Sequence, residues 1–277
     1  MKYSFLPRNP LKCAVYALTV LTICGGAAVL ATWGIIPSRA ELRARALSVR
    51  YAVEVVDRNG NYLTHIDSPE QIVVGRWDGS HGYAQPGPYV SLDDVPDNFV
   101  RDLVTIEEMK ALGFSSVDFL RALYTGDGGG STISQQAYSS IVGYKQSRPW
   151  IKKIWRKWTE MLGSVKLSLS LSRQEILETY INRIPWMNDN TVGVTHAARQ
   201  MFNKRPSDLE QHEWLMLMAR MPRPSDSLHT RQGAYKNRVQ LLYNEGYLSD
   251  QERDDLTAQW DPDPQSSPSA PPLGGFE

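Results

Sequence analysis

GGGSTISQQ, at residues 128–136, is the stretch around which the rest of the chain is best understood. Its glycines give a backbone that can take positive φ and approach a ligand closely. The hydroxyl and amide side chains that follow can hydrogen-bond phosphate or sugar oxygens. Taken alone, such a stretch is more typical of a flexible surface loop than of a site. Two neighbours favour a site, namely the pair Glu107-Glu108 and the sequence RKWTE at residues 156–160.

Several motifs follow one another along the chain. They are GxSTIxQQ at 129–136, RKxxE at 156–160, EILExYIN at 175–182 and GVxxAAxxxFxK at 193–204. In this order they resemble the motifs of the peptidoglycan glycosyltransferase family. That family includes monofunctional biosynthetic transglycosylases and the glycosyltransferase domain of class A penicillin-binding proteins. The resemblance covers about residues 95–225 and implies a lysozyme-like helical lobe.

The spacing of apolar residues predicts a mainly α chain. Helices are expected from near Pro96 to the glutamate pair, over residues 117–124, and over residues 150–171 with an apolar stripe. Capping-box sequences that begin at Ser172 and Ser207 predict the starts of two more helices.

A smaller region precedes this lobe. Residues 39–50 predict a helical stem, residues 51–66 predict a β-hairpin around the sequence RNGN, and residues 67–94, rich in glycine and proline, predict a loop. We therefore divide the chain into a cytoplasmic stub and transmembrane anchor (1–38), a stem with a small β accessory and loops (39–94), the glycosyltransferase lobe (95–260) and a disordered Pro/Ser-rich tail (261–277).

The amino-terminal segment predicts a transmembrane helix. Residues 13–38 carry no charge, and their apolar run is long enough to cross a bilayer. The run exceeds the apolar core of a signal peptide, which favours an uncleaved anchor, although VLA at residues 29–31 leaves a cleaved signal as an alternative. Basic residues flank the span on both sides and do not set its orientation. The resemblance implies a single pass through the bacterial inner membrane, with the amino terminus cytoplasmic and the lobe outside.

Composition argues against a nucleic-acid-binding protein and against a disulfide-stabilised scaffold. Thirty basic and thirty acidic residues cancel, so no overall field favours a nucleic-acid partner. Both cysteines, Cys13 and Cys24, lie in the apolar amino-terminal segment, so the remainder cannot be a disulfide scaffold.

Joining two lipid-linked sugars requires a base for a sugar hydroxyl and cations for a departing pyrophosphate. The resemblance implies that Glu107 is the base that activates the 4-hydroxyl of the acceptor. It implies that Glu160 lies near the pyrophosphate, either orienting it or holding a divalent metal such as Mg or Mn. Two further groups are implied to bind substrate: Ser131, Thr132, Gln135 and Gln136 in the donor cleft, and Lys152, Lys153, Arg156 and Lys157 at the phosphates. Glu178 and Asn182 are further candidate substrate-binding residues, which either support the site from behind or contact the substrate directly.

The chain departs from the family pattern at several positions. The usual aspartate, phenylalanine and histidine of the first motif are Glu108, Ala111 and Phe114. A lysine usual after the second glutamine is Ser139. Because that lysine is expected to touch phosphate, its absence puts full activity in doubt.

Three functions therefore stay open. The first is a monofunctional enzyme that polymerises lipid II into glycan strands and thereby supports cell wall synthesis and cell shape. No transpeptidase is expected, because no Ser-x-x-Lys and Lys-Thr-Gly pair follows the lobe. The second is a weak or inactive relative that binds lipid II or acts as a scaffold, and the third is a lytic muramidase. Expected partners are lipid II, the growing strand, membrane lipid (touched by apolar residues within 112–119) and other cell wall synthases.

Overall fold

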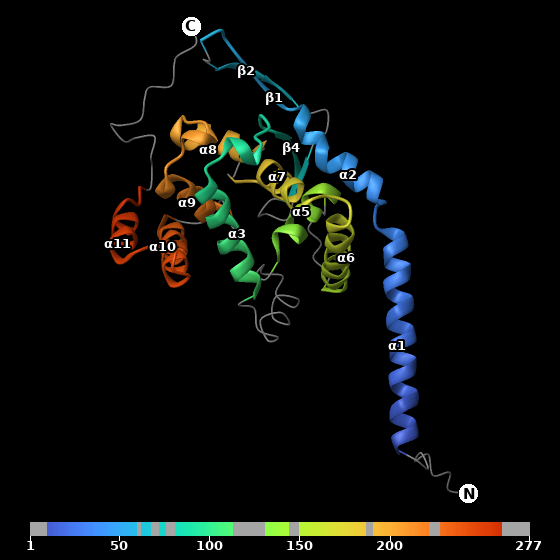
Figure 1. Ribbon diagram of the computed structural model, residues 1–277. Coiled ribbons are helices and arrows are strands. Elements are labelled where there is room, and N and C mark those ends of the chain that lie inside the picture. Colours follow the sequence, from blue (N-terminus) through green and yellow to red (C-terminus); the bar gives the residue numbers. More distant parts are fainter. Residues whose placement is uncertain are drawn as a thin grey trace, which may run out of the picture. The chain divides into compact units, whose positions relative to one another are not determined.

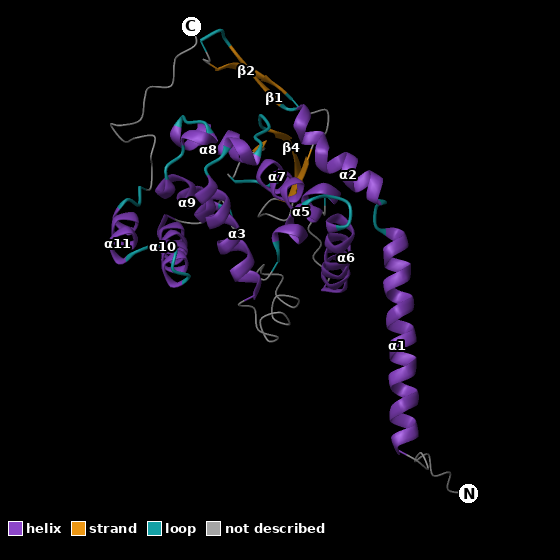
Figure 2. Cartoon of the chain, in the orientation of Figure 1, coloured by secondary structure: helices purple, strands orange, loops and turns teal. Residues whose placement is uncertain are grey.

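The computed structural model describes residues 10–59, 62–67, 72–75, 81–112, 131–143, 150–186, 191–221 and 228–261. The chain divides into two compact units, Met1–Ser38 and Arg39–Glu277. Helices dominate the second unit and strands are few, which confirms the predicted mainly α fold (Figures 1 and 2). The predicted helix over 117–124, the glycines at 128–130, Phe114 and the tail from 262 onward lie outside the described residues.

The first unit contains the helix α1 (Pro10–Ile35). Its segment Leu18–Ile35 has a mean hydropathy of 1.8 and is 6% buried within the structure. By length and composition this segment could cross a membrane, as predicted, although a signal sequence near an amino terminus meets the same test. Large apolar side chains such as Leu30, 74% exposed, suit a lipid environment better than water.

The second unit is a lobe of packed helices, as the resemblance implied. Its helices are α2 (Arg39–Leu47), α3 (Asp97–Leu112), α5 (Ile133–Val142), α6 (Trp150–Ser168), α7 (Arg173–Arg183), α8 (Val194–Phe202), α9 (Gln211–Arg220), α10 (Leu228–Asn244) and α11 (Asp250–Ala258). Helix α7 is buried along its length from Ile176 to Arg183, and α5 packs against both α6 and α7. Phe99 stacks near Trp186 and Trp214, with ring centroids 6.3 and 6.0 Å apart, so aromatic rings join α3 to α9 in the core.

Helix starts follow the capping signals, with one correction. The Ser172 side chain accepts from the Glu175 amide at 3.2 Å, and the Glu175 carboxylate accepts from the Ser172 amide at 2.8 Å, which confirms the predicted capping box of α7. The box predicted at Ser207 is wrong. Residues Pro206–Asp208 form a short 3-10 helix, and Glu210 caps α9 instead.

Two small sheets accompany the helices. Strands β1 (Val53–Val56) and β2 (Tyr62–Ile66) pair antiparallel, as predicted for the hairpin. The loop predicted over 67–94 is wrong in part, because it contains β3 (Ile72–Gly75), β4 (His81–Pro86) and the 3-10 helix Leu92–Asp94.

The second sheet depends on a partner from far along the chain. Strand β4 pairs antiparallel with β3 and parallel with β5 (Thr191–Val192). Ile72, Ala84 and Val192, one from each strand, are buried together. The many glycines and prolines of 67–94 led to the prediction of a loop, although the β-branched residues 72–74 form a strand. The sheet that contains this strand is completed by the distant strand β5.

Helix α6 exposes the apolar stripe predicted for it. The exposed members of the stripe are Ile151, Ile154, Trp155, Met161 and Val165. The buried face instead carries Glu160 and Gly163. A Cβ at Gly163 would lie 2.1 Å from the Tyr138 ring, so α6 approaches α5 more closely than a larger residue would allow. A face with small and polar residues therefore packs inward together with Leu167, and these apolar residues of the stripe are exposed among the described residues.

Candidate active site

Helix α3 places Glu107 at the edge of the helical core. Leu103 and Ile106 are fully buried, as their spacing predicted, and Glu107 follows directly with 6% exposure. Gln136 of α5 donates from Nε2 to Glu107 Oε2 at 2.9 Å. Burial raises the pKa of the Tyr180 hydroxyl well above its ordinary value, and the negative charge of Glu107 adds to the rise. Tyr180 is therefore a neutral neighbour of this carboxylate at physiological pH.

The start of α5 fixes the polar residues of the central motif. The Thr132 hydroxyl accepts from the Gln135 amide at 3.3 Å and caps the helix. Gln136 Nε2 also donates to the Ser131 carbonyl, at 3.2 Å. Thr132 thus serves the helix end, while Ser131 and the two glutamines are held in fixed positions beside it.

Helix α6 presents its charged residues to this motif. Lys157 Nζ donates to Ser131 Oγ at 2.6 Å and to Gln135 Oε1 at 3.2 Å. Glu160 lies 3.3 Å from Arg156 Nε and 3.5 Å from Lys157 Nζ, across the i, i+4 and i, i+3 spacings of one helix. We call Ser131, Gln135, Arg156, Lys157 and Glu160 the Lys157 cluster.

A continuous path of polar contacts joins the two predicted catalytic carboxylates. It runs from Glu107 through Gln136 and Ser131 to Lys157 and Glu160. Glu107 thus contacts the start of α5 directly through Gln136, and Glu160 is linked to the same segment through Lys157. The structure brings together the acids, the hydroxyl and the amides that could activate a sugar hydroxyl and stabilise an anionic leaving group.

Two other predicted phosphate ligands lie near the start of α6. Lys152 is exposed there, and the side chain of Lys153 lies outside the described residues. Their role stays a prediction. Ser139 lies on α5 one helical turn after Gln135, so a lysine at this position would project toward the Lys157 cluster.

Glu178 and Asn182 support the lobe. Glu178 accepts from Arg50 and from the Tyr89 hydroxyl, both at 2.7 Å. Burial alone would raise the pKa of Glu178, but hydrogen bonds from Tyr89 and Arg50 outweigh it and lower the pKa below its ordinary value. Asn182 bonds the Val90 amide at 3.0 Å and the Val90 carbonyl at 2.8 Å.

These contacts tie the region before α3 to α7. Sequence reasoning missed Arg50 and Tyr89, because no local pattern connects them with a helix more than eighty residues away.

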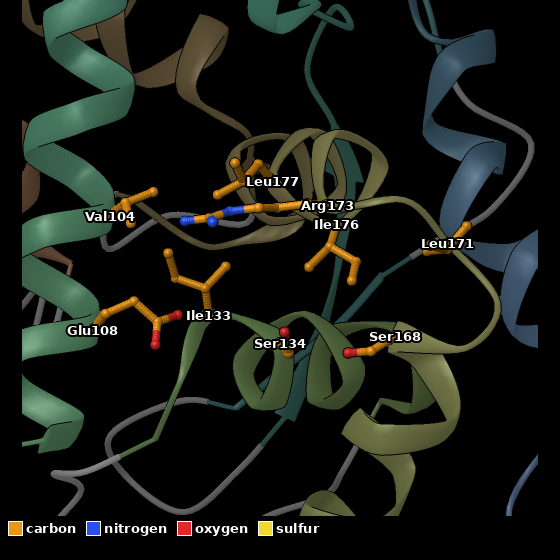
Figure 3. A pocket seen from close by; sticks show the side chains of 9 residues that line it. All are labelled: Val104, Glu108, Ile133, Ser134, Ser168, Leu171, Arg173, Ile176 and Leu177. Carbon is orange, nitrogen blue, oxygen red and sulfur yellow. The ribbon is translucent and has the colours of Figure 1, made fainter.

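A separate cavity of about 500 Å³ opens between α3, α5 and the start of α7. Its walls are formed by Val104, Glu108, Ile133, Ser134, Ser168, Leu171, Arg173, Ile176 and Leu177. Figure 3 shows that the side chains of Glu108 and Arg173 point into the same space from α3 and α7. Neither Glu107 nor Glu160 lines this cavity, so it neighbours the carboxylate path without containing it.

The surroundings of Glu160 do not suit a divalent metal. Such an ion prefers several oxygen ligands. The charged groups closest to Glu160 are two cations, Arg156 and Lys157, and the described residues contain no group of three or more His, Cys, Asp or Glu that could hold a metal. The two cations supply the positive charge that a metal would bring, and metal binding stays a prediction.

Comparison with known proteins identifies the family of this chain. A model of the transglycosylase family matches residues 75–245. The chain is 29% identical over 164 residues to the biosynthetic peptidoglycan transglycosylase of Haemophilus influenzae (strain PittEE), which covers 56% of this chain and 66% of that protein. It is 26% identical over 248 residues to penicillin-binding protein 1A/1B of Bacillus subtilis (strain 168), which covers 84% of this chain and 24% of that protein.

The chain thus spans about a quarter of the length of the Bacillus protein. The match to the family model extends over more than half of the 277 residues and includes every motif quoted above. This chain belongs to the transglycosylase family, and the resemblance of its motifs to those of the peptidoglycan glycosyltransferases is confirmed.

Proposed function

We propose that this chain is a membrane-anchored glycosyltransferase that polymerises lipid II into glycan strands for the bacterial cell wall. The observation that carries the proposal is the path from Glu107 through Ser131 and Lys157 to Glu160. A base and a cluster of cations meet at one helix start, as the transfer of a sugar from a pyrophosphate requires. Membership of the transglycosylase family supports the same reaction.

In the proposed reaction the 4-hydroxyl oxygen of lipid II attacks the anomeric carbon of the growing strand. Glu107 accepts the hydroxyl proton as the new glycosidic bond forms. The bond from the anomeric carbon to pyrophosphate breaks, and the lipid pyrophosphate leaves with the bonding electrons. Arg156 and Lys157 stabilise its negative charge, and Glu160 orients both cations through its ion pairs.

Membrane lipid is the second partner in the proposal. With its amino terminus in the cytoplasm, α1 would anchor the lobe outside the inner membrane, where a lipid-linked substrate is reached by diffusion in two dimensions. The exposed face of α6, with Trp155 49% and Val165 51% exposed, suits contact with the bilayer surface. Cysteine labelling of intact cells tests the orientation, because a cysteine placed before α1 should be protected and one in α11 should react.

Labelled lipid II and the full chain in detergent provide the test of activity. Wild-type protein is expected to produce polymer, and Glu107→Gln is expected to produce none. Glu245→Gln, an exposed change outside the site, serves as the matched control and should retain activity. Absence of polymer from folded wild-type protein would reject the enzymatic proposal.

A second function is favoured by one feature of the chain. Ser139 replaces the lysine that the family motif places near phosphate, so a protein that binds lipid II without turnover is the alternative. Saturable binding of labelled lipid II to wild-type protein, with no polymer at long incubation, would support this alternative.

A further inference from the structure

The cavity between α3, α5 and α7 carries opposite charges on two of its walls. The Glu108 carboxylate enters it from α3 and the Arg173 guanidinium from α7, and both side chains point into the same space (Figure 3). Neither group forms a hydrogen bond or an ion pair with any residue that the structure describes. The two charges therefore share the cavity without meeting, and a ligand between them can satisfy both.

The rest of the cavity wall is mainly apolar. Five of its nine lining residues are apolar, namely Val104, Ile133, Leu171, Ile176 and Leu177. Most of these side chains belong to the core of the lobe, so the packing of the helices fixes the apolar part of the wall. The volume of about 500 Å³ lies in the range of pockets that hold small organic ligands. A suitable ligand has an apolar body with a cationic group and an anionic group.

This arrangement discriminates among classes of ligand. A phosphate group alone would be attracted by Arg173 and repelled by Glu108. A hydrocarbon chain would fill the apolar part, but the carboxylate and the guanidinium would lose water without gaining a partner. In a peptide segment an ammonium group can donate to Glu108, and a carboxylate can accept from Arg173 in the bidentate geometry that a guanidinium favours. Small apolar side chains of such a peptide suit the wall between the two charges.

The cavity adjoins the path that joins the two candidate catalytic carboxylates. Glu108 follows Glu107 on α3, and successive residues of a helix project about 100° apart. Ser134 in the cavity wall directly precedes Gln135, which accepts from Lys157 at 3.2 Å. Helices α3 and α5 thus each present one residue to the cavity and its neighbour to the path. A branch of a substrate held at the path is within short reach of the cavity.

We propose that this cavity binds a peptide segment that carries both an ammonium and a carboxylate group, with Glu108 as the partner of the ammonium and Arg173 as the partner of the carboxylate. Such a segment has two sources, the peptide attached to the sugar of lipid II and free peptide of the same chemistry. The first source rests on the proposed function. Glu108 is one methylene longer than the aspartate usual in the family motif, so its carboxylate reaches farther into the cavity.

Binding of a soluble probe to the full chain in detergent tests the cavity without turnover. The probe is N-acetylmuramyl pentapeptide that contains lysine, and its partner probe has the lysine amine acetylated. Wild-type protein should bind the first probe saturably and the acetylated probe about 2- to 5-fold more weakly, as expected for a partly exposed charge pair. Glu108→Gln should weaken binding of the first probe by the same factor and leave binding of the acetylated probe unchanged. Arg173→Gln should weaken binding of both probes equally, because acetylation leaves the carboxylates intact.

Two exposed charges outside the cavity provide matched controls. Glu245→Gln and Lys236→Met should bind both probes as wild type does. Circular dichroism checks that each variant is folded; if Glu108→Gln is not, the acetylated probe on wild type and Arg173→Gln decide. No saturable binding to folded wild-type protein would overturn the proposal. An equal loss for both probes in Glu108→Gln would also overturn it, because Glu108 would then not contact the ammonium.

The kinetics of polymerisation distinguish the two sources of the peptide. If the peptide of lipid II occupies the cavity, Glu108→Gln should raise KM for lipid II about 2- to 5-fold with kcat close to wild type. Lipid II with an acetylated amine should then give the same KM in wild type and in Glu108→Gln. Binding of the soluble probe with no change of KM would support the cavity for free peptide and reject the substrate as its source. Inactive wild-type protein would reject the proposed enzyme, and the soluble probe would still decide the cavity.

Discussion

The two carboxylates of the site occupy contrasting surroundings. Glu160 takes its cations from its own helix, three and four residues away. Glu107 accepts a hydrogen bond from Gln136 of α5 and neighbours Tyr180 of α7, so its partners include residues of two other helices. One environment is thus local and cationic, and the other is assembled by tertiary packing.

This difference suits a division of labour. A proton acceptor works best when its pKa is tuned by burial and a limited number of neighbours. Stabilising a leaving pyrophosphate needs cations that the substrate can reach, and Arg156 and Lys157 are 33% and 22% exposed. The contrast predicts that changes at the two ends will have different kinetic signatures.

The largest effect on the rate of polymerisation should come from a change at Glu107, the carboxylate of α3. Glu107→Gln removes the proton acceptor and keeps the shape of the side chain, so polymerisation should fall by about 10²–10⁴-fold. Glu160→Gln leaves both cations in place and should cost less. Rates of lipid II consumption measure both changes. Equal losses in the two variants would show that the two carboxylates share one role, which would contradict the proposed division of labour.

At the exposed end, Lys157→Met removes the cation that contacts both Ser131 and Glu160. Loss of one preorganised donor to a developing anion should lower kcat by about 10²–10³-fold, with the pH profile unchanged in shape. Lys236→Met controls for the loss of net charge. A shift of the acidic limb in Lys157→Met would mean that this lysine governs the ionisation of the base and does not act on the leaving group alone.

The same contrast explains what the sequence could predict. The cations around Glu160 follow from helical spacing, because i, i+3 and i, i+4 residues are neighbours on any helix. The box at Ser172 is equally local. The contact between Gln136 and Glu107 carries no such signal, since the two residues meet only because α5 packs on α3.

Two features that the sequence did not reveal have the same cause. Strand β4 needs β5 as a neighbour, and their pairing joins Pro86 to Val192 across more than a hundred residues. The orientation of α6 depends on how Gly163 meets Tyr138, and the apolar stripe alone does not reveal it. Local spacing therefore predicted helix positions, but it could not predict which face of a helix packs inward or which distant side chain meets Glu107.

A third cation near Arg156 and Lys157 should increase the rate of polymerisation. Ser139→Lys restores the lysine of the family motif one turn from Gln135, where a third cation could share the pyrophosphate charge. We expect an increase in kcat of up to about tenfold, equivalent to about 1.4 kcal/mol of transition-state stabilisation. Ser139→Met, with similar length and no charge, is the matched control. An equal response to both variants would mean that the effect is steric.

The smallest expected effect concerns Glu178, a motif residue whose partners differ from those of both Glu107 and Glu160. Its pKa is lowered in the fold below the ordinary value of 4.5. The ionised form therefore stabilises the fold above about pH 4.5, and this contribution is lost as the pH falls through the lowered value. Glu178→Gln should cost about 1–3 kcal/mol of unfolding free energy at pH 7, because charge-assisted bonds from Arg50 and Tyr89 are weakened.

The stability of the Glu178→Gln variant should also fall less steeply than that of wild type between pH 5 and pH 3. Urea unfolding followed by circular dichroism measures both quantities, and Glu245→Gln, on an exposed surface, provides the reference slope. Parallel slopes for wild type and Glu178→Gln would show that the Arg50–Glu178 ion pair adds nothing to folding. Glu178 would then belong with the substrate-binding residues, since a buried carboxylate whose ion pair does not stabilise the lobe needs another reason to be there.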